Sequence, residues 1–123
     1  MHRILVVDDD RLVADTLALV FQKHGYDARA AYSTDGALKC ACEFPPQLML
    51  CDITMPGSDG LTLVQHMNRE FPDCHIIVLT GFYSNLARVH EQAARLSRPL
   101  GVLIKPCQPA ELLRHADAML AGV

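Results

Sequence analysis

The stretch Arg3-Ile4-Leu5-Val6-Val7-Asp8-Asp9-Asp10 decides how the rest of this sequence is interpreted. An uninterrupted apolar run of this length indicates a strand that is buried on both faces, as in the middle of a parallel sheet. The run ends at three carboxylates, which repel one another and are costly to remove from water. Two interpretations are open: a site for a hard cation such as Mg²⁺, or solvated acids at a helix N-terminus, where they favour the helix dipole.

Length and composition limit the class of protein. We expect a single domain over residues 1–123 with no output domain in this chain, because 123 residues suffice for one core. A net charge of −3 with scattered Arg and Lys argues against a nucleic-acid partner. We see no signal peptide and no apolar run long enough to cross a bilayer, and five irregularly spaced cysteines argue against disulfides. These features predict a cytoplasmic protein with no membrane partner.

Apolar runs alternate with helical patterns along the whole chain. Strands are predicted at residues 3–7, 26–31, 48–51, 75–79 and 100–104. Helices are predicted at residues 11–24, from Ser33 or Thr34 to Pro45, around residues 61–67, at residues 86–96 and from Pro109 onward, with Gly25 ending the first. Strands that alternate with helices in this way predict a doubly wound α/β domain with a parallel sheet.

Polar side chains follow four of the predicted strands. They are Asp8, Asp9 and Asp10 after the first strand, Asp52 after the third, Thr80 after the fourth and Lys105 after the fifth. Open α/β sheets bind ligands at the carboxyl ends of their strands, so we expect these side chains to surround one crevice. Carboxylates can hold a cation, one carboxylate can act as a nucleophile, and a hydroxyl and an ammonium can bind phosphoryl oxygens. The combination predicts metal-assisted phosphoryl transfer to an aspartate.

These residues and their order resemble the receiver domain of two-component response regulators, including chemotaxis receivers. The resemblance covers nearly the whole chain and includes the segments Asp52-Ile53-Thr54-Met55-Pro56-Gly57-Ser58-Asp59-Gly60, Leu79-Thr80-Gly81 and Ile104-Lys105-Pro106. It implies a flavodoxin-like (βα)5 fold whose five-stranded parallel sheet has the order 2-1-3-4-5.

The resemblance implies a phosphoacceptor and a metal site. Asp52 would take a phosphoryl group from a phosphohistidine on a sensor histidine kinase or a phosphotransfer protein. Mg²⁺ would be held by Asp9, Asp52 and the backbone carbonyl of Thr54, with Asp8 assisting through a water molecule. Apart from its own phosphorylation and slow dephosphorylation, the domain would catalyse nothing, and phosphorylation would alter the surface that it offers to a downstream target protein. It would be a monomer or a weak, phosphorylation-dependent dimer.

Further residues complete the implied site or depart from the family pattern. Lys105 would pair with the phosphoryl oxygens, the Thr80 hydroxyl would bond to them after transfer, and the peptide between Lys105 and Pro106 would be cis. Asp10 lies beyond the acid pair of the family, and we interpret it as the N-cap of the first helix. Val102 stands where many receivers have an aromatic residue that moves with the threonine, so that switch is expected to be absent or replaced.

Other classes of protein share parts of this pattern. A Mg²⁺-dependent phosphohydrolase of the haloacid dehalogenase type would use Asp8 as its nucleophile, because Asp8-x-Asp10 matches its first motif superficially. Leu12 departs from that motif, however, and Asp52 would then have no role. A flavodoxin-like FMN carrier fits the fold, but three carboxylates would repel its phosphate. A degenerate receiver that only binds a partner is opposed by the complete set of acids, Thr and Lys.

Overall fold

The computed structural model describes residues 2–53, 60–81, 91, 100–105 and 107–121. In these ranges the strands are β1 (Arg3–Val7), β2 (Asp27–Ala31), β3 (Leu48–Asp52), β4 (His75–Thr80) and β5 (Leu100–Ile104). The helices are α1 (Arg11–Lys23), α2 (Thr34–Glu43), α3 (Gly60–Glu70) and α5 (Pro109–Ala121). The helix predicted at residues 86–96 lies outside the described residues except for Glu91.

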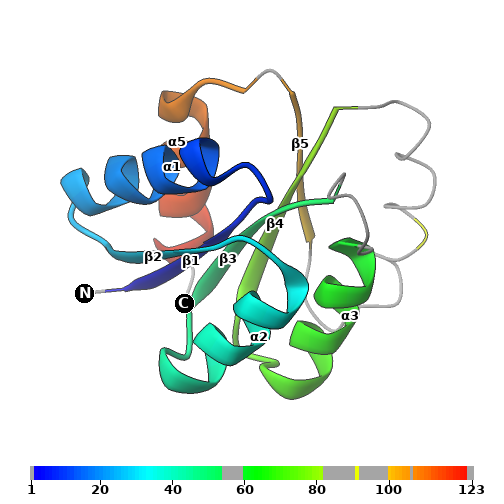
Figure 1. Ribbon diagram of the computed structural model, residues 1–123. Coiled ribbons are helices and arrows are strands. Elements are labelled where there is room, and N and C mark those ends of the chain that lie inside the picture. The colour runs from blue at the N-terminus through cyan, green and yellow to red at the C-terminus, as the bar shows by residue number, and fades with distance from the viewer. Residues whose placement is uncertain (1, 54–59, 82–90, 92–99, 106, 122–123) are drawn as a thin grey trace.

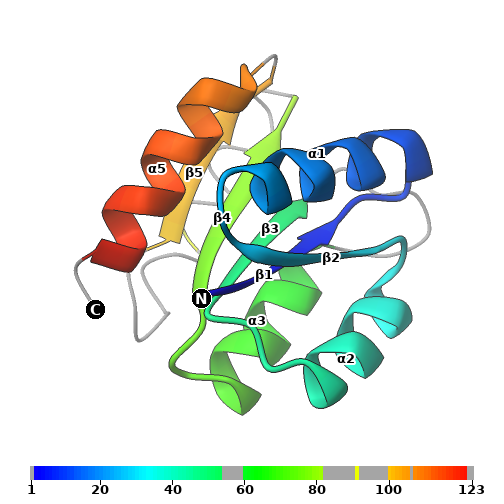
Figure 2. The same ribbon diagram turned by 90° about the vertical axis from the view of Figure 1, so that its left-hand side faces the viewer.

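All five strands are parallel and form one sheet in the order β2-β1-β3-β4-β5. Helices α1 and α5 cover one face of the sheet, and α2 and α3 cover the other (Figures 1 and 2). The doubly wound, flavodoxin-like fold predicted from the sequence is therefore confirmed.

The apolar strands are explained by the two cores, one on each face of the sheet. Successive side chains of a strand point to opposite faces. Ile4 and Val6 accordingly pack against α1 and α5, whereas Leu5 and Val7 pack against α2 and α3. Every residue of β3 is buried. Full burial of one such side chain stabilises the fold by about 1.5–3 kcal/mol, so a continuous apolar run is what a central strand requires.

Short local signals set the ends of the helices. The Asp10 carboxylate accepts hydrogen bonds from the amides of Leu12 and Val13 and so caps α1, and the Ser33 hydroxyl accepts one from the amide of Gly36 at the start of α2. Gly25 has a φ of 101°, a left-handed conformation that commonly ends a helix and that glycine adopts without strain. The caps at Asp10 and Ser33 set where α1 and α2 begin. The cap at Asp10 lies beside the acids that follow β1.

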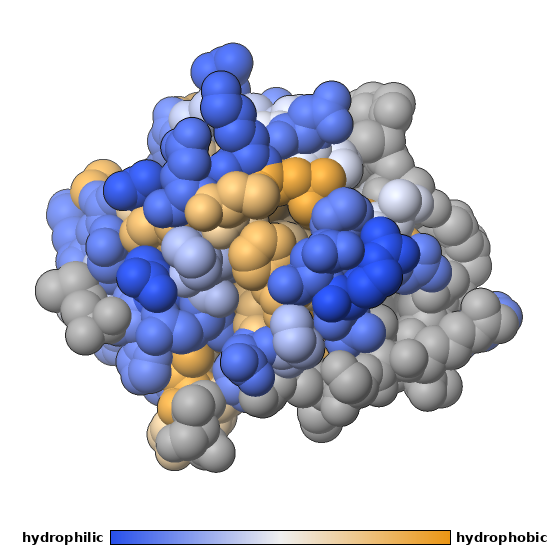
Figure 3. Space-filling view, turned by 90° about the horizontal axis from the view of Figure 1, so that it is seen from below, coloured by the Kyte–Doolittle hydropathy of each residue, from blue (hydrophilic) through white to orange (hydrophobic). Residues whose placement is uncertain are grey.

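On the face seen from below, most of the described residues are hydrophilic, and a band of apolar residues crosses that face (Figure 3). None of the helices in the described ranges is both long and apolar enough to cross a bilayer. All five cysteines lie in those ranges, and none of them is paired in a disulfide there.

Candidate functional site

The carboxyl ends of β1, β3, β4 and β5 meet at one edge of the sheet (Figure 1). Asp52 is the last residue of β3 and pairs in register with Leu79, and Thr80 is the last residue of β4 and pairs with Ile104. Asp8 and Lys105 follow β1 and β5 directly. The strand order, which puts β1 beside β3, therefore brings side chains from positions 8 to 105 of the chain together.

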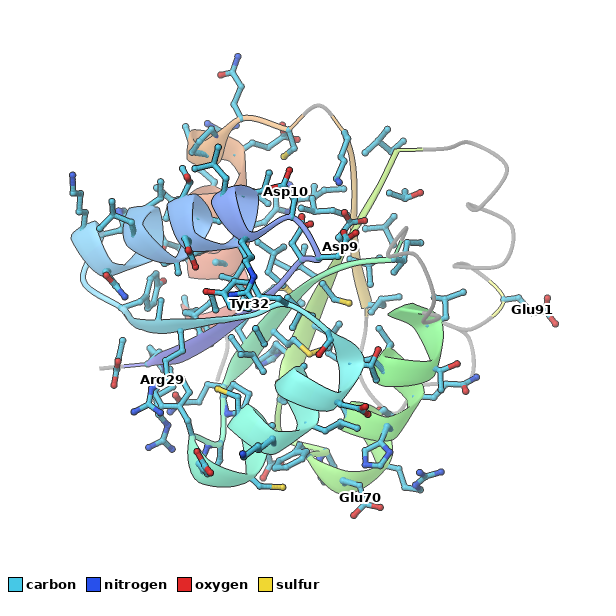
Figure 4. The ribbon with its side chains drawn as sticks, viewed as in Figure 1. Asp9, Asp10, Arg29, Tyr32, Glu70 and Glu91 are labelled. Carbon is cyan, nitrogen blue, oxygen red and sulfur yellow. The ribbon has the colours of Figure 1, made fainter. Side chains whose placement is uncertain are left out.

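Three carboxylates form a cluster at this edge. One oxygen from each of Asp8, Asp9 and Asp52 can be chosen so that all three lie within 4.8 Å of one another. Asp8 and Asp52 are each only 3 % exposed, whereas Asp9 is exposed at the upper end of the sheet (Figure 4). Clustered carboxylate oxygens with one open side are a suitable site for a hard cation such as Mg²⁺, which keeps several waters and uses one or two carboxylates.

Lys105 supplies the positive charge at the cluster. Its Nζ lies 2.6 Å from Oδ2 of Asp52, a charge-assisted hydrogen bond. The backbone holds it there, because the Lys105 amide donates to the carbonyl oxygen of Thr80 at 2.8 Å. One ammonium can offset only one of the three carboxylate charges, so the site retains an excess of negative charge that a divalent cation would relieve.

The surroundings of Asp8 raise the pKa of its carboxyl. The pKa of the Asp8 carboxyl is raised from 3.8 to about 6, mainly by burial and to a smaller extent by the nearby charges of Asp52 and Asp9. The Asp10 amide, which donates to Oδ1 of Asp8 at 3.0 Å, and the Lys105 ammonium act in the opposite direction. Near neutral pH, Asp8 is therefore ionised at a cost, and a bound cation would remove that cost.

Asp10 has a different role from its two neighbours. Its carboxylate accepts hydrogen bonds from the amides of Leu12 and Val13, at 3.0 and 3.3 Å, and Figure 4 shows it at the first turn of α1. Its interpretation as a helix N-cap is confirmed. The bond from its amide to Asp8 was not predicted, although an aspartate that accepts from the amide two residues later is a common turn, and the Asp8-x-Asp10 spacing could have indicated it.

Of the remaining predicted positions, two lie within the described residues and two do not. Thr80 is fully buried at the end of β4. Val102 lies in β5 and pairs in register with Val78 of β4. Its side chain is partly buried and packs against the core between the sheet and helices α2 and α3. Thr54, with its predicted metal-binding carbonyl, and Pro106, with the predicted cis peptide, lie outside the described residues.

An open cavity of about 650 Å³ lies next to the cluster. Lys105, which is paired with Asp52, lines this cavity together with Gly81, and the remaining wall is mostly apolar. On α1, Leu12 is 76 % exposed and Val13 is 37 % exposed. Large apolar side chains so exposed beside a polar site are typical of a surface that another molecule covers.

Comparison with known proteins places these features in a family. Residues 4–117 match the family model described as the response regulator receiver domain. The chain is 32 % identical to the transcriptional regulatory protein AruR of Pseudomonas aeruginosa, in an alignment that covers 98 % of this chain and 50 % of AruR. The chain thus spans half the length of that relative.

Solved structures agree with the fold. A CheY-like receiver domain protein from Methanospirillum hungatei is 26 % identical with a TM-score of 0.87, over 99 % of this chain and 95 % of that one. NtrX from Brucella abortus is also 26 % identical, with a TM-score of 0.85, but the match covers 98 % of this chain and only 27 % of NtrX. By its family model, its sheet order and its acids at the strand ends, this chain belongs to the family of response regulator receiver domains.

Proposed function

We propose that this domain accepts a phosphoryl group on Asp52 from a phosphohistidine, with Mg²⁺ bound at the acid cluster, and then changes a surface that binds another protein. The observation that carries the proposal is the environment of Asp52: its Oδ2 lies 2.6 Å from the Lys105 ammonium, and its carboxylate belongs to a cluster with Asp8 and Asp9. A buried carboxylate that faces both a cation and a potential metal site is well placed to accept phosphate.

In the proposed transfer, a carboxylate oxygen of Asp52 attacks phosphorus in line with the leaving imidazole. The new bond joins that oxygen to phosphorus, and the bond between phosphorus and the histidine nitrogen breaks. Asp8, Asp9 and Asp52, with the Thr54 carbonyl, would hold Mg²⁺, which would neutralise charge on the carboxylates and on the phosphoryl oxygens. The reaction needs no further co-substrate, and the product is an acyl phosphate.

Lys105 and Thr80 would respond to the new phosphoryl group. The Lys105 ammonium, which pairs with Asp52, would shift its hydrogen bonds to phosphoryl oxygens, and the Thr80 hydroxyl would bond to another. Because the Lys105 amide donates to the Thr80 carbonyl, the ends of β4 and β5 would respond together. Phosphorylation need only bias an equilibrium between two surfaces, and with Val102 in place of an aromatic residue that bias would be transmitted by aliphatic packing.

The phosphodonor would be a sensor histidine kinase or a phosphotransfer protein. We propose that it covers the apolar cavity beside Lys105, with Leu12 and Val13 as contact residues. The output would be a contact with a downstream protein in the cytoplasm, made by a monomer or a weak phosphorylation-dependent dimer. AruR is described as a transcriptional regulator, but the net charge of −3 supports a domain that does not itself bind nucleic acid.

Two observations disfavour the phosphohydrolase alternative. Asp8 would be its nucleophile, yet burial and neighbouring charge raise the Asp8 pKa to about 6, and its Oδ1 accepts the Asp10 amide. The carboxylate of Asp10, which would then act as the acid, is engaged in capping α1. These contacts favour a cap and a buried acid over a pair of catalytic groups as the explanation of the pattern Asp8-x-Asp10.

Incubation with Mg²⁺ and acetyl phosphate, followed by intact mass spectrometry, tests the proposal. Wild type should gain the mass of one phosphoryl group, and Asp52→Asn should gain none. Omission of Mg²⁺ should abolish the gain in wild type. If the donor were hydrolysed by Asp52→Asn but not by Asp8→Asn, the reaction would be that of the hydrolase, and the proposal would be wrong.

A further inference from the structure

Gly60, the first residue of α3, is buried directly against the end of β3. A Cβ atom at this position would lie 2.6 Å from the Cα of Ile53, 3.1 Å from the carbonyl oxygen of Asp52 and 3.2 Å from the Cβ of Ile53. The first two are backbone atoms, which cannot rotate away from a contact that is too close. A side chain at position 60 would therefore displace either the end of β3 or the start of α3.

The other glycines in the described ranges lack this property. At Gly101, a Cβ would first meet the side chains of Ile77 and Met119, at 3.1 and 3.5 Å, and such side chains can adjust. At Gly25 nothing lies within 4 Å, so the positive φ alone makes a substitution costly there. Among the glycines that the structure describes, Gly60 is thus the one whose closest approach is to backbone.

The backbone beside Gly60 carries Asp52. On the side of β4, the Ile53 amide donates to the carbonyl oxygen of Leu79 at 3.2 Å. The end of β3 is therefore held between β4 and the start of α3. The position of the Asp52 carboxylate follows from this clamp, and its Oδ2 lies 2.6 Å from Lys105 Nζ. A displacement of about 1 Å at a reacting group can reduce a rate by about a hundredfold.

We propose that Gly60 is a positioning residue for Asp52: the absence of a side chain lets α3 press on the end of β3 and hold the acceptor carboxylate between Lys105 and the other two acids. The inference rests on the proposed function in that it assigns Asp52 as the acceptor. Helix propensity alone predicts that Gly60→Ala would stabilise α3, because alanine favours a helix over glycine. The proposal predicts instead that this substitution harms the site.

The test compares Gly60→Ala with wild type by two measurements on folded protein. The first is the dissociation constant for Mg²⁺ from calorimetric titration, and the second is the phosphorylation rate at saturating acetyl phosphate and Mg²⁺. We expect Gly60→Ala to weaken Mg²⁺ binding and to slow phosphorylation, each by about tenfold or more. A loss of stability alone would leave both values unchanged for the molecules that remain folded.

Gly101→Ala and Gly25→Ala are the matched controls, because each perturbs the chain at a glycine remote from the acids. Both should keep the wild-type Mg²⁺ affinity and rate even where they lower the melting temperature. If Gly60→Ala is partly unfolded, sucrose is added to all variants to favour the folded state. Wild-type values for folded Gly60→Ala would overturn the inference, and so would a chain that stays unfolded in sucrose, since Gly60 would then support the whole fold.

Failure of the proposed function gives a different result. Wild type would then take no phosphoryl group, while the Mg²⁺ titration would still compare the position of the Asp52 carboxylate in the two chains. A tenfold loss of Mg²⁺ affinity in Gly60→Ala would uphold the positioning role in that case, and an unchanged affinity would remove it.

Discussion

Replacement of Asp8 by asparagine should make the metal-free domain more stable. In the folded chain the Asp8 pKa is about 6, against an ordinary value of 3.8, because burial and neighbouring carboxylates disfavour the charged form. Between these two values the folded chain holds more protons than the unfolded chain, so stability falls as the pH rises through this window. Above about pH 6 the penalty is complete, and a shift of about two units corresponds to about 3 kcal/mol.

Asn at position 8 removes the charge and keeps an oxygen that can accept the Asp10 amide, which is bonded to Oδ1 of Asp8. We therefore expect Asp8→Asn to raise the free energy of unfolding by about 2–3 kcal/mol at about pH 8 without divalent metal. The gain should shrink as the pH falls and should vanish below about pH 3, where Asp8 is protonated in both states. Because a ligand at a hundred times its Kd stabilises a protein by about 2.7 kcal/mol, saturating Mg²⁺ should close much of the gap by stabilising wild type.

Urea denaturation followed by circular dichroism measures these differences. Asp27→Asn is a suitable control, because Asp27 is exposed at the start of β2. It should change the free energy of unfolding by no more than about 0.5 kcal/mol at either pH. The reasoning would be refuted if Asp8→Asn were no more stable than wild type at about pH 8, or if its advantage were the same at about pH 4.

Three further predictions follow from the same contacts. Lys105→Met removes the ammonium that pairs with the buried Asp52 carboxylate, so the stability of the metal-free domain should fall by roughly 1–3 kcal/mol, and Mg²⁺ should restore part of it. Equal melting curves for wild type and Lys105→Met would argue against the ion pair. Asp10→Ala should lose about 1 kcal/mol of stability through the cap while Asp10→Asn retains it, and a large loss of Mg²⁺ affinity in Asp10→Asn would instead make Asp10 a ligand. Mg²⁺ affinity should weaken as the pH falls through about 6, where Asp8 takes up a proton, and calorimetry of Asp8→Asn should not show this step.

The fold was largely predictable because the apolar runs report burial directly. The bounds of β1 and β5 were predicted correctly, since charged or polar residues adjoin both runs. Predicted ends for β3 and β4 were each one residue short. Asp52 and Thr80 still pair with Leu79 and Ile104, and the register between strands cannot be read from one segment alone.

The sequence predicted which residues form the site, but it did not predict the contacts between them. Strand order brings Asp8 and Asp52 to one edge, and the resemblance to receivers supplied that order. The pKa of Asp8 depends on burial and on the Asp10 amide, and the contact between Gly60 and Ile53 depends on how α3 packs. The burial of Asp8 and the close approach of Gly60 arise from the packing of helices on the sheet, so local sequence signals do not contain them. The bond from the Asp10 amide, by contrast, is local, and the spacing of the two aspartates could have indicated it.

The location of the phosphoryl group is the most direct test of the account. Wild type incubated with Mg²⁺ and acetyl phosphate is treated with borohydride, which reduces an acyl phosphate on aspartate to homoserine, and is then mapped by peptide mass spectrometry. The account predicts homoserine at position 52, dependent on Mg²⁺ and absent without the phosphodonor. Homoserine at position 8, or at neither position despite a gain of phosphoryl mass, would contradict it.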